Sequence, residues 1–336
     1  MTTVLPEDQR LREISPRAFE HPADRAATAA LHAVPMLDTA VRKLIEFGYE
    51  SSLRQSLLSA SVKLGDDQMP DVWADYRAAL ARLDMPEVYD LYITQFPITN
   101  AAAIGSGKPL IVLTSQTVEL CDELELRTVL GHEVGHVLAD HVLYLTALEI
   151  LLALGTSGPL PSVAGLPLVG VKLALLEWFR AAELTGDRAA TLVTRDPMAT
   201  CRTLMVIAAG ATSRRLNLDA FVRQAADYED WDPGWDRLRR LPRELGQTHP
   251  VPVRRVRELM RWVQSGEYDR VMSGEYVRRG NERGARQEAA DAVDFYTERF
   301  RGFFRDAGAT VSKAGDQLAD ARDKLADWLR QRRDPG

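Results

Sequence analysis

The sequence predicts a mainly α-helical fold with a small β-sheet, that is, an α+β domain. Apolar residues recur every three or four positions along most of the 336 residues, which is the spacing of half-buried helices. Only a few short segments have the length and composition of strands. The hydrophobic content of 46% and the charged content of 27% are ordinary for a globular protein. A chain of this length can form one large domain or two small ones.

The first part of the chain contains the predicted sheet between predicted helices. Helices are expected at 22–34, 36–47 and 71–84, and strands at 87–94 and 109–114, which flank residues 100–105. Pro35 separates the first two helices, and proline suits the start of a helix. Asp71 is a residue type that often caps the beginning of a helix. Residues 186–225 again have a helical pattern.

Residues 132–136 read His-Glu-Val-Gly-His within a helical pattern and are the most informative feature of the chain. On a helix, His132 and His136 lie one turn apart, so both imidazoles can bind one zinc ion. Glu133 can then reach a water molecule at the metal and act as its general base. The alternative is a buried helix with two histidines that form ordinary hydrogen bonds.

Catalytic zinc normally takes three protein ligands, so a third ligand is required. His141 follows His136 by five residues and would point about 140° away on a continuing helix, which favours a polar residue near the helix end over a ligand. Glu183 is the better candidate. Asp187 lies one helical turn further on the same side and could accept a hydrogen bond from a ligating histidine. The alternative for these two acids is a solvated helix face.

Four blocks of sequence together resemble the HtpX and CAAX-prenyl-protease metallopeptidases, the gluzincins of metallopeptidase family 48. The blocks are Asn100–Gly105, Val129–His136 followed by His141, Glu183–Asp187, and Thr248–Pro250 followed by Arg255. Ala102 stands where the family has an aromatic residue, Gly186 replaces a common alanine, and a second proline is displaced to Pro252. The resemblance covers about residues 20 to 265 and implies a soluble member with a zincin-type peptidase domain.

The resemblance also implies a role for each matching residue. Zinc is expected at His132, His136 and Glu183, with Glu133 as general base and acid, Asp187 beside the ligands, His249 and Arg255 at the oxyanion, and Asn100, Ala101, Ala103 and Gly105 in an edge strand that binds substrate. Such a strand holds an extended peptide through main-chain hydrogen bonds. Two alternatives stay open: His249 before a proline is an ordinary turn residue, or Arg254 exchanges roles with Arg255.

The expected function is therefore a zinc-dependent endopeptidase with one zinc ion per chain. Metal-activated water would hydrolyse peptide bonds with Glu133 as general base. Its substrate would be an unfolded or extended polypeptide, and its role would be in protein quality control. The alternative is a catalytically silent or latent metal-binding scaffold that associates through an apolar hairpin and a C-terminal helix.

The apolar hairpin is predicted at residues 143–179. No charge occurs between Glu149 and Lys172, and prolines and glycines divide the region into two apolar helices, 143–154 and 166–179. Each helix is too short to span a bilayer, which requires about 20 apolar residues. We expect the hairpin to pack on or near the site, with peripheral membrane contact as the alternative.

The predicted domains are an N-terminal extension at 1–20, the peptidase domain at 21–268, a linker at 269–286 and a C-terminal helix at 287–333. In the last of these, apolar residues repeat every seven positions over about five repeats, which is typical of a coiled coil. This pattern favours self-association, with a helix folded back onto the body as the alternative.

Composition excludes some classes of function. The net charge is −6 and basic residues are scattered, so no nucleic-acid partner is expected. Cys121 and Cys201 lack the spacing of a metal or redox motif. The first ten residues contain acids and no apolar core, so we expect no signal peptide. A cytoplasmic location is expected, with membrane association as the alternative.

Overall fold

The computed structural model describes most of the region that the resemblance covers. The described residues are 10–46, 55, 59–95, 100–105, 108–153, 162–163, 166–228, 251–282, 297, 300–302 and 305. His249 and nearly all of the predicted C-terminal helix at 287–333 lie outside these residues.

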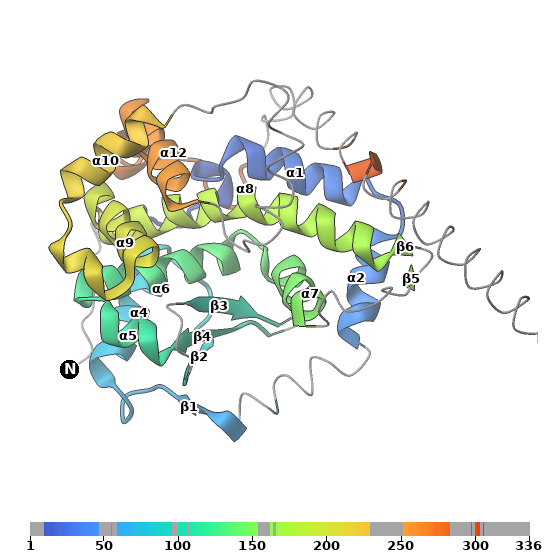
Figure 1. Ribbon diagram of the computed structural model, residues 1–336, viewed down its shortest axis with the longest axis horizontal. Helices are drawn as coiled ribbons and strands as arrows, with labels where there is room; N and C mark the ends of the chain where they lie inside the picture. The colour runs from blue at the N-terminus through green and yellow to red at the C-terminus, as the bar shows by residue number, and fades with distance from the viewer. Residues whose placement is uncertain are drawn as a thin grey trace, which may run out of the picture.

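Helices dominate the described chain, and the expected mainly α fold with a small sheet is confirmed (Figure 1). The α-helices are α1 (Pro22–His32), α2 (Leu37–Glu46), α4 (Pro70–Arg82), α5 (Ser115–Leu120), α6 (Glu123–Leu138), α7 (Val142–Ala153), α8 (Leu168–Thr194), α9 (Pro197–Ala209), α10 (Leu218–Asp227), α12 (Pro252–Gln264) and α13 (Glu267–Met272). Short 3-10 helices are η2 (Pro16–Ala18) and η3 (Gly210–Arg215). The strands are β1 (Ser61–Lys63), β2 (Asp90–Thr94), β3 (Ala101–Ile104), β4 (Leu110–Thr114), β5 (Ser162–Val163) and β6 (Leu166–Pro167).

Three of the predicted helical regions differ from the observed helices. The region 186–225 is divided among the end of α8, α9, η3 and α10. The helix expected at 71–84 begins at Pro70, and Asp71 lies in its first turn rather than at its N-cap. The short helix expected at 166–179 is the first half of α8, which runs unbroken for 27 residues to Thr194. The first half of α8 is apolar and the second half is more polar, but the backbone is helical throughout. The change in composition therefore suggested a helix end at residue 179 that does not exist.

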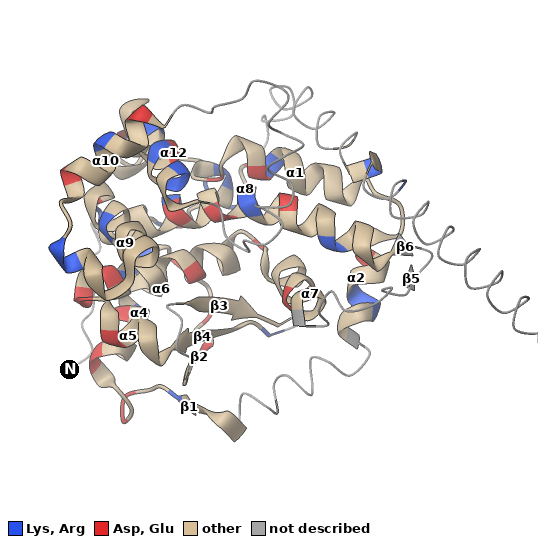
Figure 2. Ribbon diagram, viewed as in Figure 1, with Lys and Arg blue, Asp and Glu red and all other residues tan. Residues whose placement is uncertain are grey.

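The main sheet has four strands in the order β1-β2-β4-β3, with β2 and β4 parallel and the other pairs antiparallel. Strand β3 lies at one edge, as predicted for residues 100–105. β3 and β4 carry no charged residue, whereas α12 and α10 carry many (Figure 2). The edge of the sheet nearest α6 and α7 is therefore apolar.

The hydrogen bonds of β3 determine which of its amides face outward. The Thr114 amide donates to the Asn100 carbonyl, so the alternation of an antiparallel ladder directs Ala102 and Ile104 toward β4. The backbone groups of Ala101 and Ala103 point away from β4. The outer edge of the sheet thus carries the backbone groups of these two residues. The Ala101 amide donates to Oδ1 of Asn100 at 2.9 Å, and the Ala103 backbone has a hydrogen bond with the Glu133 carboxyl group.

Two groups of buried side chains form the core. One group joins the sheet to α4, α6, α9 and α12, and the other joins α1, α2, α7 and the first half of α8. In Figure 1, α8 crosses the molecule between α1 on one side and α6 on the other, with the sheet beyond α6. The helix with the histidine motif therefore lies between the sheet and α8.

Helices α6 and α8 approach so closely that glycine is required at three contact points. A Cβ on Gly131 would lie 2.8 Å from Cβ of Val193. A Cβ on Gly135 would lie 2.3 Å from Cβ of Ala189, and a Cβ on Gly186 would lie 2.5 Å from Cε1 of His132. Real Cβ atoms do not come so close to other atoms. The glycines allow the second half of α8 to reach the histidines of α6.

The predicted hairpin at 143–179 packs against the body of the protein where it is described. Leu148, Leu151, Leu175 and Trp178 are buried with residues of α1 and α2. Within the described residues, no single helix combines the length and apolar composition of a membrane span. Taken together, the helices at 123–138 and 142–152 have the length and apolar composition of a membrane span, and the chain bends by 108° between them.

Residues on the outer sides of the predicted boundaries at 20 and 268 also contribute to the core. Ile14 and Phe19 are buried in the same group as Val271. The Ser15 amide donates to the Val277 carbonyl, so the two segments pair with each other. The domain boundaries themselves remain a prediction.

Candidate metal centre

Helix α6 starts at a well-defined cap, which fixes the position of the motif. The Asp122 side chain accepts from the Glu125 amide while the Glu125 side chain accepts from the Asp122 amide, a reciprocal capping box. Glu125 is fully buried and its carboxylate accepts two hydrogen bonds from Arg214, at 2.7 and 2.6 Å. Two turns further along, His132 and His136 project from the same face toward α8.

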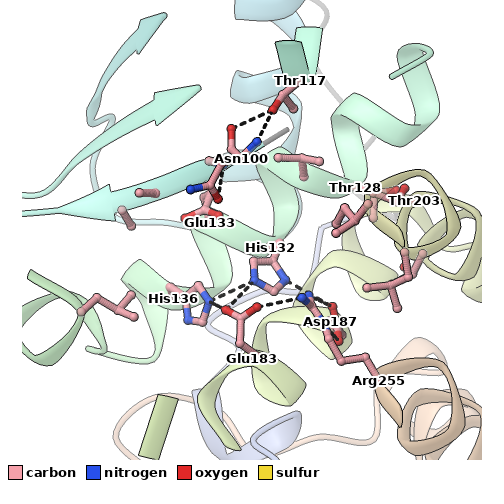
Figure 3. A pocket seen from close by; sticks show the side chains of 18 of the residues that line it. Asn100, Thr117, Thr128, His132, Glu133, His136, Glu183, Asp187, Thr203 and Arg255 are labelled. Atoms are coloured by element: carbon pink, nitrogen blue, oxygen red, sulfur yellow. Dashed lines mark hydrogen bonds and ion pairs between the residues drawn. The ribbon is translucent and has the colours of Figure 1, made fainter. Parts of the chain in front are cut away.

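Three possible ligand atoms converge between α6 and α8 (Figure 3). Nε2 of His132 lies 3.0 Å from Nε2 of His136, and Oε1 of Glu183 lies 3.3 Å and 3.2 Å from these two nitrogens. Tetrahedral zinc binds nitrogen and oxygen at about 2.0–2.1 Å, which places its ligands about 3.3 Å apart. The spacing and chemistry of the three atoms therefore fit a zinc ion.

Arg255 holds the two carboxylates of α8 from the opposite side. Its Nη1 donates to Oε2 of Glu183 at 2.8 Å, while Nε and Nη2 donate to the two oxygens of Asp187 at 2.8 and 2.6 Å. Asp187 Oδ1 also lies 3.4 Å from Nδ1 of His132. Oε1 of Glu183 is left directed at the histidines, and Asp187 can accept the Nδ1 proton of His132, which leaves its Nε2 lone pair for a metal.

The charges of these buried groups are coupled. Burial alone would raise the pKa of Glu183, but Arg255 and His132 hold it well below its usual value. Burial would lower the pKa of His132, but Glu183 and Asp187 outweigh it and raise that pKa to about 10. Burial lowers the pKa of His136 to about 4. A cation at the three ligand atoms would thus take the place of a proton held by His132 between two carboxylates.

Glu133 lies on the β3 side of His132 (Figure 3). Burial raises the pKa of its carboxyl group to about 7, partly opposed by His132 and by a hydrogen bond with the Ala103 backbone. A group whose pKa is near neutrality can accept and return a proton at physiological pH. The position and the pKa therefore suit a general base and acid.

A pocket open to solvent connects the metal centre with the edge strand. It is lined by Asn100–Ala103 of β3, by His132, Glu133, His136, Glu183, Asp187 and Arg255, and by Thr117, Thr128, Val129, Leu145, Glu149, Phe179, Thr200, Thr203, Leu204 and Ile207. Gly105 is not part of the lining; its amide donates to Oγ1 of Thr146, and the single hydroxyl proton of Thr146 is shared between the carbonyls of Val142 and Gly105. That clamp anchors the far end of β3 on α7.

Most of the predicted site residues thus meet around one pocket. The exceptions are Gly105, at the anchored end of β3, and His249, which lies outside the described residues. Arg255 was expected at the oxyanion, and its observed contacts are with Glu183 and Asp187. Its oxyanion role remains a prediction.

Sequence reasoning missed two buried residues beside the site. His141 was placed at the helix end as a polar residue, but its Nδ1 lies 2.9 Å from Nδ1 of His136. This contact is possible because α6 ends at Leu138 and the chain turns at Asp140, where φ is positive. Asp24 of α1 contacts His141 at 3.1 Å, and no local signal in the sequence connects it with the motif.

Comparisons with known proteins agree with this geometry. The family model "Peptidase family M48" matches residues 67–263. Plastoglobule-localized metallopeptidase 48, chloroplastic, from Arabidopsis thaliana is 36% identical over 257 residues, which are 74% of this chain and 73% of that protein. No solved structure gives a significant match. The resemblance to metallopeptidase family 48 is confirmed, and the chain belongs to peptidase family M48 as a metalloendopeptidase.

Proposed function

We propose that this metallopeptidase holds one zinc ion through His132, His136 and Glu183. The observation that carries the proposal is the convergence of two imidazole nitrogens and one carboxylate oxygen, each within 4.8 Å of the others. Two imidazoles with one carboxylate form a donor set typical of catalytic zinc. When bound, the ion would polarise a substrate carbonyl and make water nucleophilic near neutral pH.

Glu133 is the proposed general base and acid. Its buried carboxylate faces the pocket beside His132, where it takes a proton from the attacking water. The same carboxyl group then delivers that proton to the leaving amine as the peptide bond breaks. A buried carboxyl group with a pKa of about 7 is suited to both transfers.

The proposed substrate is an unfolded or extended polypeptide. The outward-facing backbone groups of Ala101 and Ala103 can pair with a peptide strand laid along the pocket, in exchange for their present hydrogen bonds with the side chains of Asn100 and Glu133. Only an extended segment can form such a ladder beside the metal centre, because a folded substrate has its own backbone groups paired. This requirement supports a role in protein quality control.

The contacts of Arg255 with Glu183 and Asp187 support a positioning role for this residue. Its guanidinium fixes the carboxylate of Glu183, so that one oxygen faces the histidines. Stabilisation of the oxyanion by Arg255 and by His249 stays a proposal. A donor at the oxyanion is worth about 3 kcal/mol in related chemistry.

Location and association stay proposals too. We propose a cytoplasmic location, with peripheral membrane contact through residues 143–179 and self-association through residues 287–333. The burial of the apolar side chains of α7 and α8 supports a hairpin that packs on the body. The name of the Arabidopsis relative places that protein at plastoglobules. Cell fractionation separates the two locations, because recovery in the membrane pellet would contradict the cytoplasmic one.

The test of the proposed function is hydrolysis of an unstructured protein, such as casein, by the purified full chain. We expect activity with zinc, loss of activity with a chelator, and recovery when stoichiometric zinc is restored. The scaffold alternative predicts no cleavage at full zinc occupancy. That result would rule out the enzymatic proposal.

A further inference from the structure

Nδ1 of His136, the ring nitrogen that does not face the proposed metal site, has a partner of its own. Its Nδ1 lies 2.9 Å from Nδ1 of His141, and Nε2 of His141 lies 3.1 Å from Oδ2 of Asp24. His141 and Asp24 are 2% and 1% exposed, so water does not compete for these contacts. A buried chain of side chains therefore leads from the proposed metal site to helix α1.

The direction of the hydrogen bonds in this chain follows from its outer end. Thr185 Oγ1 accepts from the His21 amide at 3.0 Å, so its own hydroxyl proton is free to donate to Oδ2 of Asp24 at 2.5 Å. In the same way, Thr28 Oγ1 accepts from Nε1 of Trp178 at 2.8 Å and donates to Oδ1 of Asp24 at 3.2 Å. Both carboxylate oxygens are thus acceptors. Burial would raise the pKa of Asp24, but His141 and Thr185 lower it, so the ionised carboxylate accepts from His141 as well.

The donor and acceptor roles of the two imidazoles follow from the role of Asp24. If Nε2 of His141 donates to Asp24, a neutral His141 has a lone pair on Nδ1. That lone pair accepts the Nδ1 proton of His136. A neutral His136 with its proton on Nδ1 has a lone pair on Nε2, directed at Nε2 of His132 and Oε1 of Glu183.

We propose that Asp24 and His141 form a relay of hydrogen bonds that fixes the tautomer and the ring orientation of His136 for metal binding. Both are positioning residues, because neither reaches the proposed metal or the substrate. This inference rests on the proposed zinc site. Asp24 lies outside the region 67–263 that matches the family model, so the relay makes the N-terminal segment part of the metal centre.

The two ligating histidines are then supported in different ways. Asp187 lies directly at Nδ1 of His132, at 3.4 Å. His136 reaches Asp24 only through the ring of His141, which packs edge-on against Trp178 with ring centroids 5.3 Å apart. The relay therefore holds two rings with one carboxylate and couples α1, α6 and α8.

The test is the zinc affinity of the purified full chain, measured by competition with a chromophoric chelator. We expect His141→Ala and Asp24→Ala to bind zinc about 10- to 100-fold more weakly than the wild type. His141→Asn should lose less, because Oδ1 of asparagine stands about where Nδ1 of histidine stands and can accept from His136. Higher zinc affinity in His141→Asn than in His141→Ala would show that the acceptor atom matters and not only the size of the ring.

Tyr76→Phe is the matched control. Tyr76 is fully buried in α4 and donates to the Tyr89 carbonyl at 3.1 Å, away from the metal centre. This variant removes a buried hydrogen bond and should bind zinc as the wild type does. Equal losses in Tyr76→Phe and His141→Ala, or wild-type affinity in His141→Ala, would overturn the relay. If the wild type itself binds no zinc, the proposed function fails instead.

A second measurement uses only the wild-type protein, so it does not depend on whether the variants fold. Nitrogen-15 NMR of the imidazoles in the zinc-loaded wild type reports which ring nitrogen carries each proton. The relay requires His141 to carry its proton on Nε2, with Nδ1 unprotonated. A proton on Nδ1 of His141 in the zinc-loaded protein contradicts the relay.

Discussion

Nε2 of His136 lies 3.2 Å from Oε1 of Glu183, although 47 positions separate the two residues in the chain. The contact exists because α6 and α8 meet at glycines. Gly135 faces Ala189, and Gly186 faces the His132 ring, with no room for a Cβ at either point. The metal centre is therefore a product of helix packing as much as of the ligand residues.

Gly135→Ala tests this dependence. The new methyl group would lie 2.3 Å from Cβ of Ala189, so the helices must separate, and overpacking of this kind typically costs about 1–3 kcal/mol. We expect a lower free energy of unfolding in urea and weaker zinc binding. Gly65→Ala is the control, because a Cβ on Gly65 would have no atom within 4 Å. A Gly135→Ala protein with wild-type stability and zinc affinity would show that the close approach is unimportant.

Glu133→Gln separates metal binding from catalysis. Glutamine keeps the size of the side chain but cannot take a proton from water, so we expect kcat to fall by about 10²- to 10⁴-fold. Zinc content should stay unchanged, since Glu133 is not among the converging ligand atoms. Casein hydrolysis and elemental analysis of the same preparation check both parts. Hydrolysis at the wild-type rate would show that Glu133 is not the base.

Arg255→Met should destabilise the protein strongly. It removes the guanidinium that the buried carboxylates of Glu183 and Asp187 share and leaves them the His132 ring, and breaking a buried ion pair in this way costs about 3–5 kcal/mol. Urea unfolding in the presence of chelator measures the loss without a contribution from metal. Arg127→Met is the comparison, because Arg127 is partly exposed and such pairs contribute about 0–1 kcal/mol. Equal losses in the two variants would contradict the structural role of Arg255.

Proline substitutions in β3 test the substrate edge. The Ala101 amide does not pair with β4 and donates instead to Oδ1 of the exposed Asn100, so Ala101→Pro should cost little stability and raise KM for casein. Ala102→Pro removes an amide that faces β4 and should destabilise the sheet, because proline cannot donate to a ladder. Thermal unfolding and steady-state kinetics of both variants are the measurements. Unchanged KM in Ala101→Pro would argue against pairing of the substrate with this edge.

The sequence predicted the parts of the site that depend on local spacing. His132 and His136 share a face because they lie four residues apart on a helix, and the same holds for Glu183 and Asp187. Strands β2 and β4 were predicted from the length and composition of residues 87–94 and 109–114, and β3 from the resemblance, whereas β1 (Ser61–Lys63) was not predicted. The family resemblance then linked the two helices, which spacing alone could not do.

The parts that were missed depend on contacts between distant segments. Asp24 reaches the site only because α1 packs on α8, and nothing near it in the sequence signals a contact with His141. The position of His141 was predicted on a continuing helix, but α6 ends three residues earlier. The length of α8 was missed because its first half is apolar and its second half carries the ligands, although the helix is continuous.

The most direct test of the proposed metal centre is anomalous X-ray diffraction at the zinc absorption edge, from crystals of protein that hydrolyses casein. A single anomalous peak is expected within bonding distance of Nε2 of His132, Nε2 of His136 and Oε1 of Glu183. Active protein without a peak at this position, or with its only peak elsewhere, would contradict the account.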